Sequence, residues 1–224
     1  MAVRVSDVFP RDELRYEPTE KWVRGELGGE TMVDSRRTWL VWNPGTVVPG
    51  WCFPRDDVRL AALPDDAWWD YDDPDLADRV GIAFTALDRW LEEDVEVVGH
   101  PRDPFKRVDV RRSSRHVRVL IDDEVYADSR RPLLVFETGH PTRYYLPPED
   151  VRLDRMTRSE TRSLCAYKGE ASYWSAPGAD DVAWLYPQPL PDNAELRDHV
   201  AFFGERVDIE VDGERVERPT TQWS

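Results

Sequence analysis

Two charged residues, Lys168 and Glu137, are the best candidates in this sequence for chemistry. Lys168 stands in the segment CAYKGEASYW (165–174), and it is one of only three lysines in a chain that otherwise uses arginine. A lysine amine can act as a nucleophile or base when burial tunes its pKa, and the adjacent Gly169 would leave room for a ligand. The competing interpretation is a solvated strand lysine that pairs with a carboxylate.

Glu137 belongs to an apolar strand pattern, PLLVFET (132–138), on the same face as Leu133 and Val135. A carboxylate in a pocket there would have its pKa raised by desolvation and could serve as an acid or a base. Because Gly139 and a turn follow closely, we favour the alternative position at the exposed end of the strand.

Aromatic residues and an arginine could complete a site around this pair. Neighbouring strand residues point to opposite faces, so one of Tyr144 and Tyr145 belongs to the core and the other could line a cavity. If 165–174 is one strand, Trp174 shares the face of Lys168, and Tyr173 lies on the other face. Plain core packing is the competing role for these rings. The predicted ligand-binding set is Glu137, Tyr144, Tyr145, Lys168, Tyr173, Trp174, Trp184 and Arg130.

The chain contains an internal repeat. Residues 22–45 and 116–139 share 10 identities at an offset of 94 positions, including the run Asp-Ser-Arg-Arg in both. After one residue of slippage, PRDDVRL (54–60) and PPEDVRL (147–153) share five more. Self-similarity at a fixed period indicates a repeated structural unit.

We therefore expect two tandem copies of one domain, residues 1–112 and 113–224. The junction near 111–115 is short, which predicts that the copies pack on each other. Glu137 aligns with Asn43, and the Lys168 segment has no recognisable counterpart in the first copy. A site would therefore belong to the second copy. The repeated Arg36 and Arg130 are expected to bridge strand ends to an aspartate, with anion binding as the alternative.

Hydrophobic alternation predicts a mainly β fold with little helix. In the second copy we expect strands at 116–122 and 124–129, joined by a turn at Asp122-Asp123, then further strands and a hairpin at Asp212-Gly213. The further strands are at 132–138, 143–147, 165–174 and 181–186, and the hairpin spans 206–217. One short helix is expected in each copy, at 82–93 and at 193–203, where Asn193 could cap it. The expected architecture is a pair of compact antiparallel sheets in each copy.

Composition excludes several classes of protein. The chain has 224 residues, 40% of them hydrophobic, and a formal net charge of −15, which disfavours disorder and broad nucleic-acid or membrane-surface binding. It contains no apolar run of about 18 residues and no secretory signal pattern. Four histidines and two distant cysteines predict no metal site and a reduced, cytoplasmic protein. We expect no cofactor. The acidic stretch 65–78 is interpreted as a solvated loop.

Several motifs of the second copy together resemble one family. ADSRR, ETGHPTRYYLPPEDV and SLCAYKGEASYW are similar to the bacterial family catalogued as domain of unknown function 427. The resemblance implies a small β-tent domain with antiparallel sheets around a pocket, and it implies no established activity. The family's motif positions fall on Glu137, Tyr144, Tyr145, Cys165, Lys168, Gly169 and Tyr173. Ala166 departs from the usual proline, and the first copy matches only in part.

Three hypotheses follow for the function. In the first, the second copy binds a small polar molecule beside Lys168 and Glu137. In the second, it is an enzyme that uses Lys168 with a lowered pKa as nucleophile or base and Glu137 as a proton shuttle. In the third, the two copies present a surface to a protein partner, for which an exposed apolar patch would be the sign.

Overall fold

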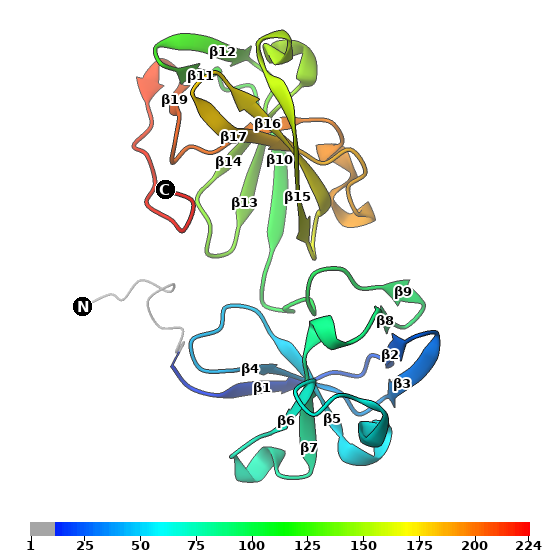
Figure 1. The fold of residues 1–224 in the computed structure, drawn as a ribbon. Coiled ribbons are helices and arrows are strands. Elements are labelled where there is room, and N and C mark those ends of the chain that lie inside the picture. Colours follow the sequence, from blue (N-terminus) through cyan, green and yellow to red (C-terminus); the bar gives the residue numbers. More distant parts are fainter. Residues whose placement is uncertain (1–11) are drawn as a thin grey trace, which may run out of the picture. The chain divides into compact units, whose positions relative to one another are not determined.

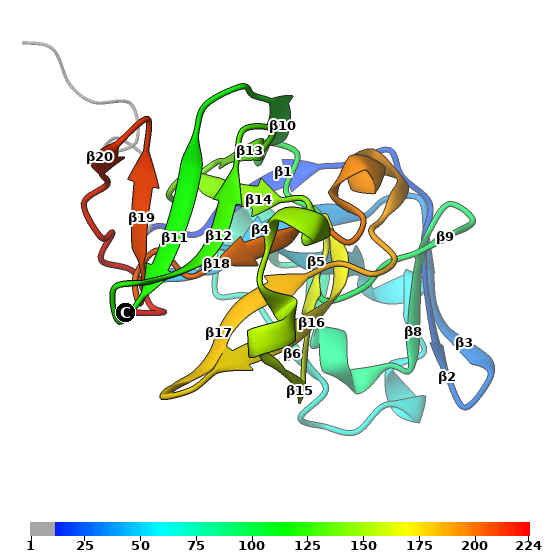
Figure 2. The same ribbon diagram turned by 90° about the horizontal axis from the view of Figure 1, so that it is seen from above.

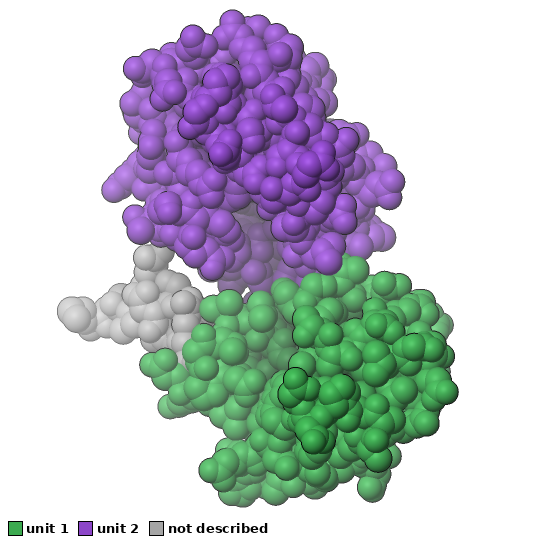
Figure 3. All heavy atoms as spheres, in the orientation of Figure 1, with its two compact units in different colours: residues 1–104 green, residues 105–224 purple. Residues whose placement is uncertain are grey.

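The structure, a computed structural model, describes residues 12–224. The chain divides into two compact units, residues 1–104 and 105–224, which Figure 3 colours separately. Strands dominate both units, so the expected mainly β class is confirmed. The described residues contain no helix with the length and apolarity that a membrane crossing requires.

The first unit contains two antiparallel sheets. A five-stranded sheet has the order β1-β4-β5-β7-β6 (Figure 1), with β1 Arg15–Pro18, β4 Trp39–Trp42, β5 Gly50–Pro54, β7 Arg79–Ile82 and β6 Trp68–Asp70. A four-stranded sheet has the order β3-β2-β8-β9, with β3 Glu30–Ser35, β2 Val23–Leu27, β8 Arg89–Glu92 and β9 Val95–Glu96.

The second unit also contains two antiparallel sheets. The larger has the order β10-β13-β14-β18-β17-β16-β15, with β10 Val108–Arg112, β13 Leu133–Glu137, β14 Arg143–Leu146, β18 Val200–Phe202, β17 Ala179–Leu185, β16 Gly169–Ala176 and β15 Thr157–Cys165. The smaller has the order β12-β11-β19-β20, with β12 Glu124–Ser129, β11 Val117–Ile121, β19 Asp208–Val211 and β20 Glu214–Arg215. Figure 2 shows β11 between β12 and β19.

The expected strands of the second unit are confirmed except for one. Both turn residues have positive φ at Asp122-Asp123 and at Asp212-Gly213, as tight hairpin turns require. The segment 165–174 is not a single strand: β15 ends at Cys165, the chain turns, and β16 begins at Gly169, which pairs with Cys165. The strand β10 precedes the boundary expected at 112/113 but pairs with β13 of the second unit.

The two expected helices are not formed. The described helical segments are short 3-10 turns at Arg55–Asp57, Leu60–Ala62, Pro74–Leu76, Phe84–Ala86, Pro148–Asp150, Leu153–Arg155 and Pro191–Leu196. Residues 82–93 hold one such turn and β8, because the buried Trp90 pairs with β2 and its indole donates to the Phe84 carbonyl. Residues 193–203 include the central strand β18, and the Asn193 amide donates to the Tyr167 carbonyl instead of capping.

The larger sheet of the second unit has apolar clusters on both faces. One cluster lies between this sheet and the smaller one and includes Val119, Leu146, Ala183 and Phe202. The other covers the opposite face and includes Leu133, Val135, Tyr145, Trp184 and Phe203. Strand alternation places Glu137 on the face of Leu133 and Val135. The candidate site therefore belongs to the second face.

The repeated Asp-Ser-Arg-Arg run fastens a strand end to a 3-10 turn in each unit. The Ser129 hydroxyl donates to Asp150 at 2.8 Å and accepts from the Arg131 backbone amide at 3.2 Å, and the Arg131 guanidinium also binds Asp150. Ser35 and Arg37 make the corresponding bonds to Asp57. The expected bridge to an aspartate exists, but the second arginine of each run forms it, not Arg36 or Arg130.

Replacing Ser129 by alanine should destabilise the second unit, because it removes a buried hydroxyl that serves two hydrogen bonds. We expect a loss of about 1 kcal/mol or somewhat more in the free energy of unfolding, measured by urea denaturation. Ser35→Ala should have a similar effect on the first unit, whereas Ser114→Ala, at an exposed position, should change stability by less than about 0.5 kcal/mol. If Ser129→Ala and Ser35→Ala lowered the free energy of unfolding by no more than Ser114→Ala does, the network would contribute nothing to stability.

Candidate functional site

Glu137 is the last residue of β13, and its side chain is buried. The β13 backbone pairs with β10, where Val108 is the register partner of Glu137. The Glu137 side chain is only 6% exposed. The position at the exposed end of a strand, which we favoured from the sequence, is therefore wrong, because cationic side chains cover the carboxylate.

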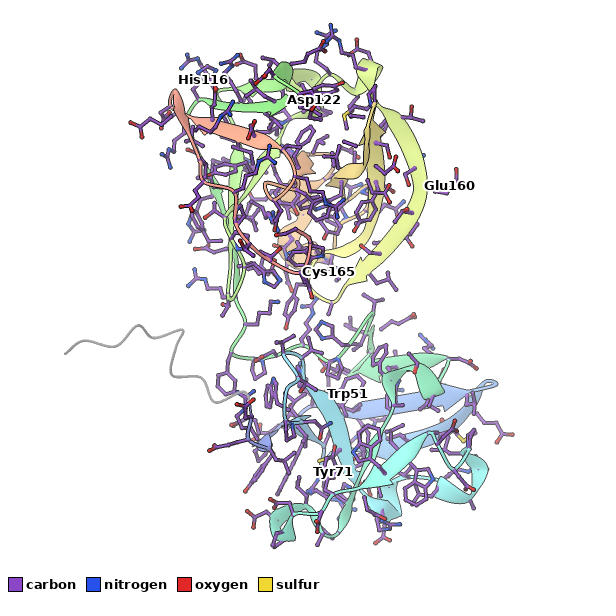
Figure 4. The ribbon with its side chains drawn as sticks, turned by 60° about the vertical axis from the view of Figure 1, so that its left-hand side comes forward. Trp51, Tyr71, His116, Asp122, Glu160 and Cys165 are labelled. Carbon is purple, nitrogen blue, oxygen red and sulfur yellow. The ribbon has the colours of Figure 1, made fainter. Side chains whose placement is uncertain are left out.

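Lys168 lies in the tight turn between β15 and β16, and Figure 4 labels Cys165 at the end of β15 where this turn begins. Its backbone amide donates to the Cys165 carbonyl, and its own carbonyl accepts from Leu190. Gly169 has φ +97°, and a Cβ there would lie 3.2 Å from the Gln188 carbonyl oxygen. The space expected for a ligand beside Gly169 is thus taken by the chain itself.

Three side chains from separate segments converge on the Glu137 carboxylate. The Lys168 ammonium, 8% exposed, donates to Oε2. The Lys106 ammonium lies 3.0 Å from Oε1, and His140 Nε2 lies 3.6 Å from the same oxygen. We call these four residues the Glu137 cluster. Two of the three lysines of the chain meet in it.

The electrostatics keep the buried pair ionised. Burial alone would raise the pKa of Glu137, but Lys168, Lys106 and His140 lower it overall. Burial alone would lower the pKa of Lys168, but Tyr145, Glu137 and Cys165 together raise it above its ordinary value. At neutral pH the pair is therefore an ammonium and a carboxylate, and Lys168 is not a free amine.

Three of the predicted residues lie in or against the apolar cluster on the Glu137 face of the sheet, and one of them, Tyr145, interacts electrostatically with Lys168 and Glu137. Trp184 Nε1 donates to the Tyr145 hydroxyl at 3.0 Å, and the two rings meet edge to face. Burial raises the pKa of Tyr145 to about 12, so it remains a neutral phenol. Tyr173 packs against the same apolar cluster and shares a hydrogen bond with Ser163. These three rings therefore form a mostly buried apolar layer on this face, and their polar atoms are already bonded within the protein.

The other predicted site residues lie elsewhere. Tyr144 and Trp174 pack against the apolar cluster on the opposite face of the sheet. For Trp174, the reason is the turn at 166–168, which breaks the alternation that would have placed it on the face of Lys168. Arg130 is exposed after β12 and is not among the described residues that contact the Glu137 carboxylate.

Sequence reasoning missed Lys106 and His140. The scarcity of lysine already marked Lys168, and the same signal could have marked Lys106, which lies 31 positions before Glu137. Nothing in the spacing singles out His140, which follows Glu137 by three residues in the loop before β14. Its pKa is lowered by burial and by the nearby cations, although Glu137 opposes this effect.

A second buried ion pair lies on the same side of the sheet. Arg143 donates to both oxygens of Glu205 at 2.6 and 2.7 Å, and the Thr221 hydroxyl adds a third bond at 2.7 Å. The guanidinium also lies over the rings of Trp184, Phe203 and Trp223. This pair is closed, because every carboxylate oxygen and the guanidinium fork are engaged within the protein.

Fold and site together define a mainly β protein with a buried lysine–glutamate cluster in its second unit. Residues 109–213 match the family described as a domain of unknown function (DUF427). The expected resemblance is thereby confirmed for this stretch, which lies within the second unit and spans less than half of the chain. No curated protein matches the chain.

Replacing Glu205 by glutamine should destabilise the second unit by about 3–5 kcal/mol at neutral pH, because it breaks a buried ion pair. Arg143 and Thr221 hold the pKa of Glu205 at about 2, although burial opposes them, against an ordinary value of 4.5. The stabilisation is therefore complete above pH 4.5 and is lost as the pH falls towards 2.

Urea denaturation at a series of pH values checks this prediction. The difference between wild type and Glu205→Gln should shrink across that acidic window, whereas Glu217→Gln, at an exposed position, should follow wild type throughout. A difference that does not change with pH would contradict the ionised pair.

The reactivity of the three lysines gives a separate prediction. Because Lys168 is buried and held as an ammonium, acetic anhydride at mildly alkaline pH should modify it last, after Lys21, whose side chain is 45% exposed, and after Lys106. Peptide mass spectrometry measures the three rates. Faster modification of Lys168 than of Lys21 would instead indicate an activated amine.

Proposed function

We propose that the second unit is a binding module for a small polar molecule, which it holds beside the Glu137 cluster. The observation that carries this proposal is the convergence of Lys106, Lys168 and His140 on one buried carboxylate. A chain that almost always uses arginine places two of its three lysines at this point. Convergent polar groups beside apolar and aromatic walls are typical of small-molecule sites.

The accessible side of the cluster supports the proposal. Lys168 closes the Oε2 side of the carboxylate and is 8% exposed. On the Oε1 side, Lys106 is 17% exposed and His140 is 30% exposed. A small molecule would therefore approach from the side of Lys106 and His140, with Tyr145, Tyr173 and Trp184 in the wall behind.

Stability alone gives a poor account of this cluster. Taking charges out of water has a cost that their mutual attraction only partly offsets, and well-packed apolar residues are often at least as stabilising. The closed Arg143–Glu205 pair satisfies its own charges. The Glu137 cluster instead places two ammonium groups on one carboxylate, and such an arrangement suits the binding of a further polar molecule.

The two alternative functions have less support. An enzyme based on Lys168 would need an amine with a lowered pKa, whereas its pKa is raised. A docking surface would need a contiguous apolar patch. Among residues 12–224, the exposed large apolar side chains include Phe136 and Leu164 of the second unit, and these lie on β13 and β15, towards opposite edges of the larger sheet.

We also propose that the first unit is a divergent copy of the second, both of the β-tent type. Removing β15 and β16 from the larger sheet of the second unit leaves the strand order of the five-stranded sheet of the first. The two smaller sheets have the same order, and each has a bulge in its first hairpin. Asn43 occupies the position of Glu137 in the aligned sequences. The first copy would thus serve as a scaffold without a site.

A cytoplasmic location is part of the same proposal. Cys52 and Cys165 are both free thiols, and they belong to different units. Reduced cysteines are the usual condition in the cytoplasm.

A thermal-shift screen against a library of metabolites tests the proposed function. A ligand that binds only the folded state increases the free energy of unfolding, by about 2.7 kcal/mol at a hundredfold excess over Kd, and therefore raises the melting temperature. We expect a compound that stabilises wild type and Lys21→Gln but not Lys168→Gln or Lys106→Gln. Lys106→Gln keeps the test valid if loss of Lys168 unfolds the unit, because Lys106 is the more exposed lysine. If no compound stabilises wild type, or both cluster variants respond like wild type, the proposal is wrong.

A further inference from the structure

We propose that the molecule held at the Glu137 cluster carries a negatively charged group, a carboxylate or a phosphate, and that this group binds to Lys106 and His140. This inference rests on the proposed function and specifies the class of ligand. It is carried by three features of the cluster: its balance of charges, its use of lysine, and the exposure of its Oε1 side.

The cluster has more positive than negative charge. Lys106 and Lys168 share the single carboxylate of Glu137. Arg143, the first cation after His140 in the sequence, is already matched by Glu205. A buried positive charge without its own counterion is costly, and an anionic ligand would supply the missing charge. In a chain of net charge −15, such a local excess is what an anion needs in order to approach.

The use of lysine in place of arginine leaves hydrogen-bond donors of the Lys106 ammonium available. A guanidinium can grip both oxygens of a carboxylate in a planar fork, as Arg143 grips Glu205. An ammonium is a compact charge with three donors, and Lys106 makes its close contact through one oxygen, Oε1. Its remaining donors can serve a second acceptor. The two ion pairs of this unit thus differ in kind: one is closed, and the other can accept a further anion.

His140 is placed to respond to an anion. Its Nε2 lies 3.6 Å from Glu137 Oε1, and its side chain is 30% exposed. Its ring and that of Trp223 meet edge to face, with their centroids 5.5 Å apart. The charged groups that act on it are Glu137, Lys106, Lys168 and Arg143, three of them cations. Burial and these cations favour the neutral imidazole. An added anion would favour the imidazolium, so that the ligand and a proton would bind together and His140 would donate a charge-assisted hydrogen bond.

Nuclear magnetic resonance of the histidine rings tests the inference on the full chain. The chain has four histidines, so the ring spectrum is simple, and His140→Gln assigns the signal. Inorganic phosphate, acetate, neutral erythritol and cationic tetramethylammonium are titrated separately, each at constant ionic strength against sodium chloride. The readout is the pKa of His140, with His116 and His199 as internal references.

Phosphate or acetate should raise the pKa of His140 by about half a unit or more in wild type and Lys21→Gln. The same anion should have no such effect in Lys106→Gln. A response to phosphate alone assigns a phosphate ligand, and a response to acetate alone assigns a carboxylate.

The inference is overturned if neither anion moves the His140 signal beyond the sodium chloride baseline, or if Lys106→Gln responds like wild type. The thermal-shift screen separates this failure from that of the proposed function. A neutral or cationic hit that depends on Lys168 and Lys106 would retain the binding module and reject the anionic ligand. The absence of any hit, of whatever charge, would reject both.

Discussion

The buried carboxylate of Glu137 is the constraint on which this side of the second unit depends. This carboxylate is 6% exposed and stays ionised because cations reach it from three segments: the one before β10, the loop after β13 and the turn before β16. Backbone hydrogen bonds fix the first two of these segments, because the Thr138 amide donates to the Arg107 carbonyl and the His140 amide donates to the Glu137 carbonyl. The turn needs Gly169 at positive φ, with the carbonyl of Gln188 close behind it. A substitution that shifts any of these segments would therefore alter the balance of charges around Glu137.

The ionic interactions of the protein divide into repeated and unrepeated ones. The hydroxyl of Ser35 or Ser129 and the guanidinium of Arg37 or Arg131 bind the aspartate of a 3-10 turn in both units. An interaction that recurs in the same form in both units needs only a structural explanation. The Glu137 cluster does not recur, since Asn43 stands at the aligned position. The free-energy cost of burying these charged side chains is thus not explained by what both units need in order to fold.

Much of the fold follows from local rules that the sequence displays. Period-two alternation located β11, β12, β13, β14 and β17, and the residues at 122–123 and 212–213 marked turns that need positive φ. The expected helices failed for a non-local reason. The apolar residues at 82–93 suit a helical face, but Trp90 packs in a strand whose partner, β2, lies more than sixty positions earlier. Sheet pairing at that distance overrides a weak local preference.

The candidate site was predictable only in part, and the reason is the turn at 166–168. Read as one strand, 165–174 places Lys168 with Trp174, whereas the hairpin turns the lysine towards Glu137 and leaves the indole on the far face. The pattern of alternation cannot reveal a tight turn that interrupts it without a proline or a run of polar residues. The choice of residue type was the more reliable signal. The rarity of lysine in an arginine-rich chain marked Lys168 and would have marked Lys106. It is informative because a compact ammonium and a planar guanidinium bind their partners in different geometries.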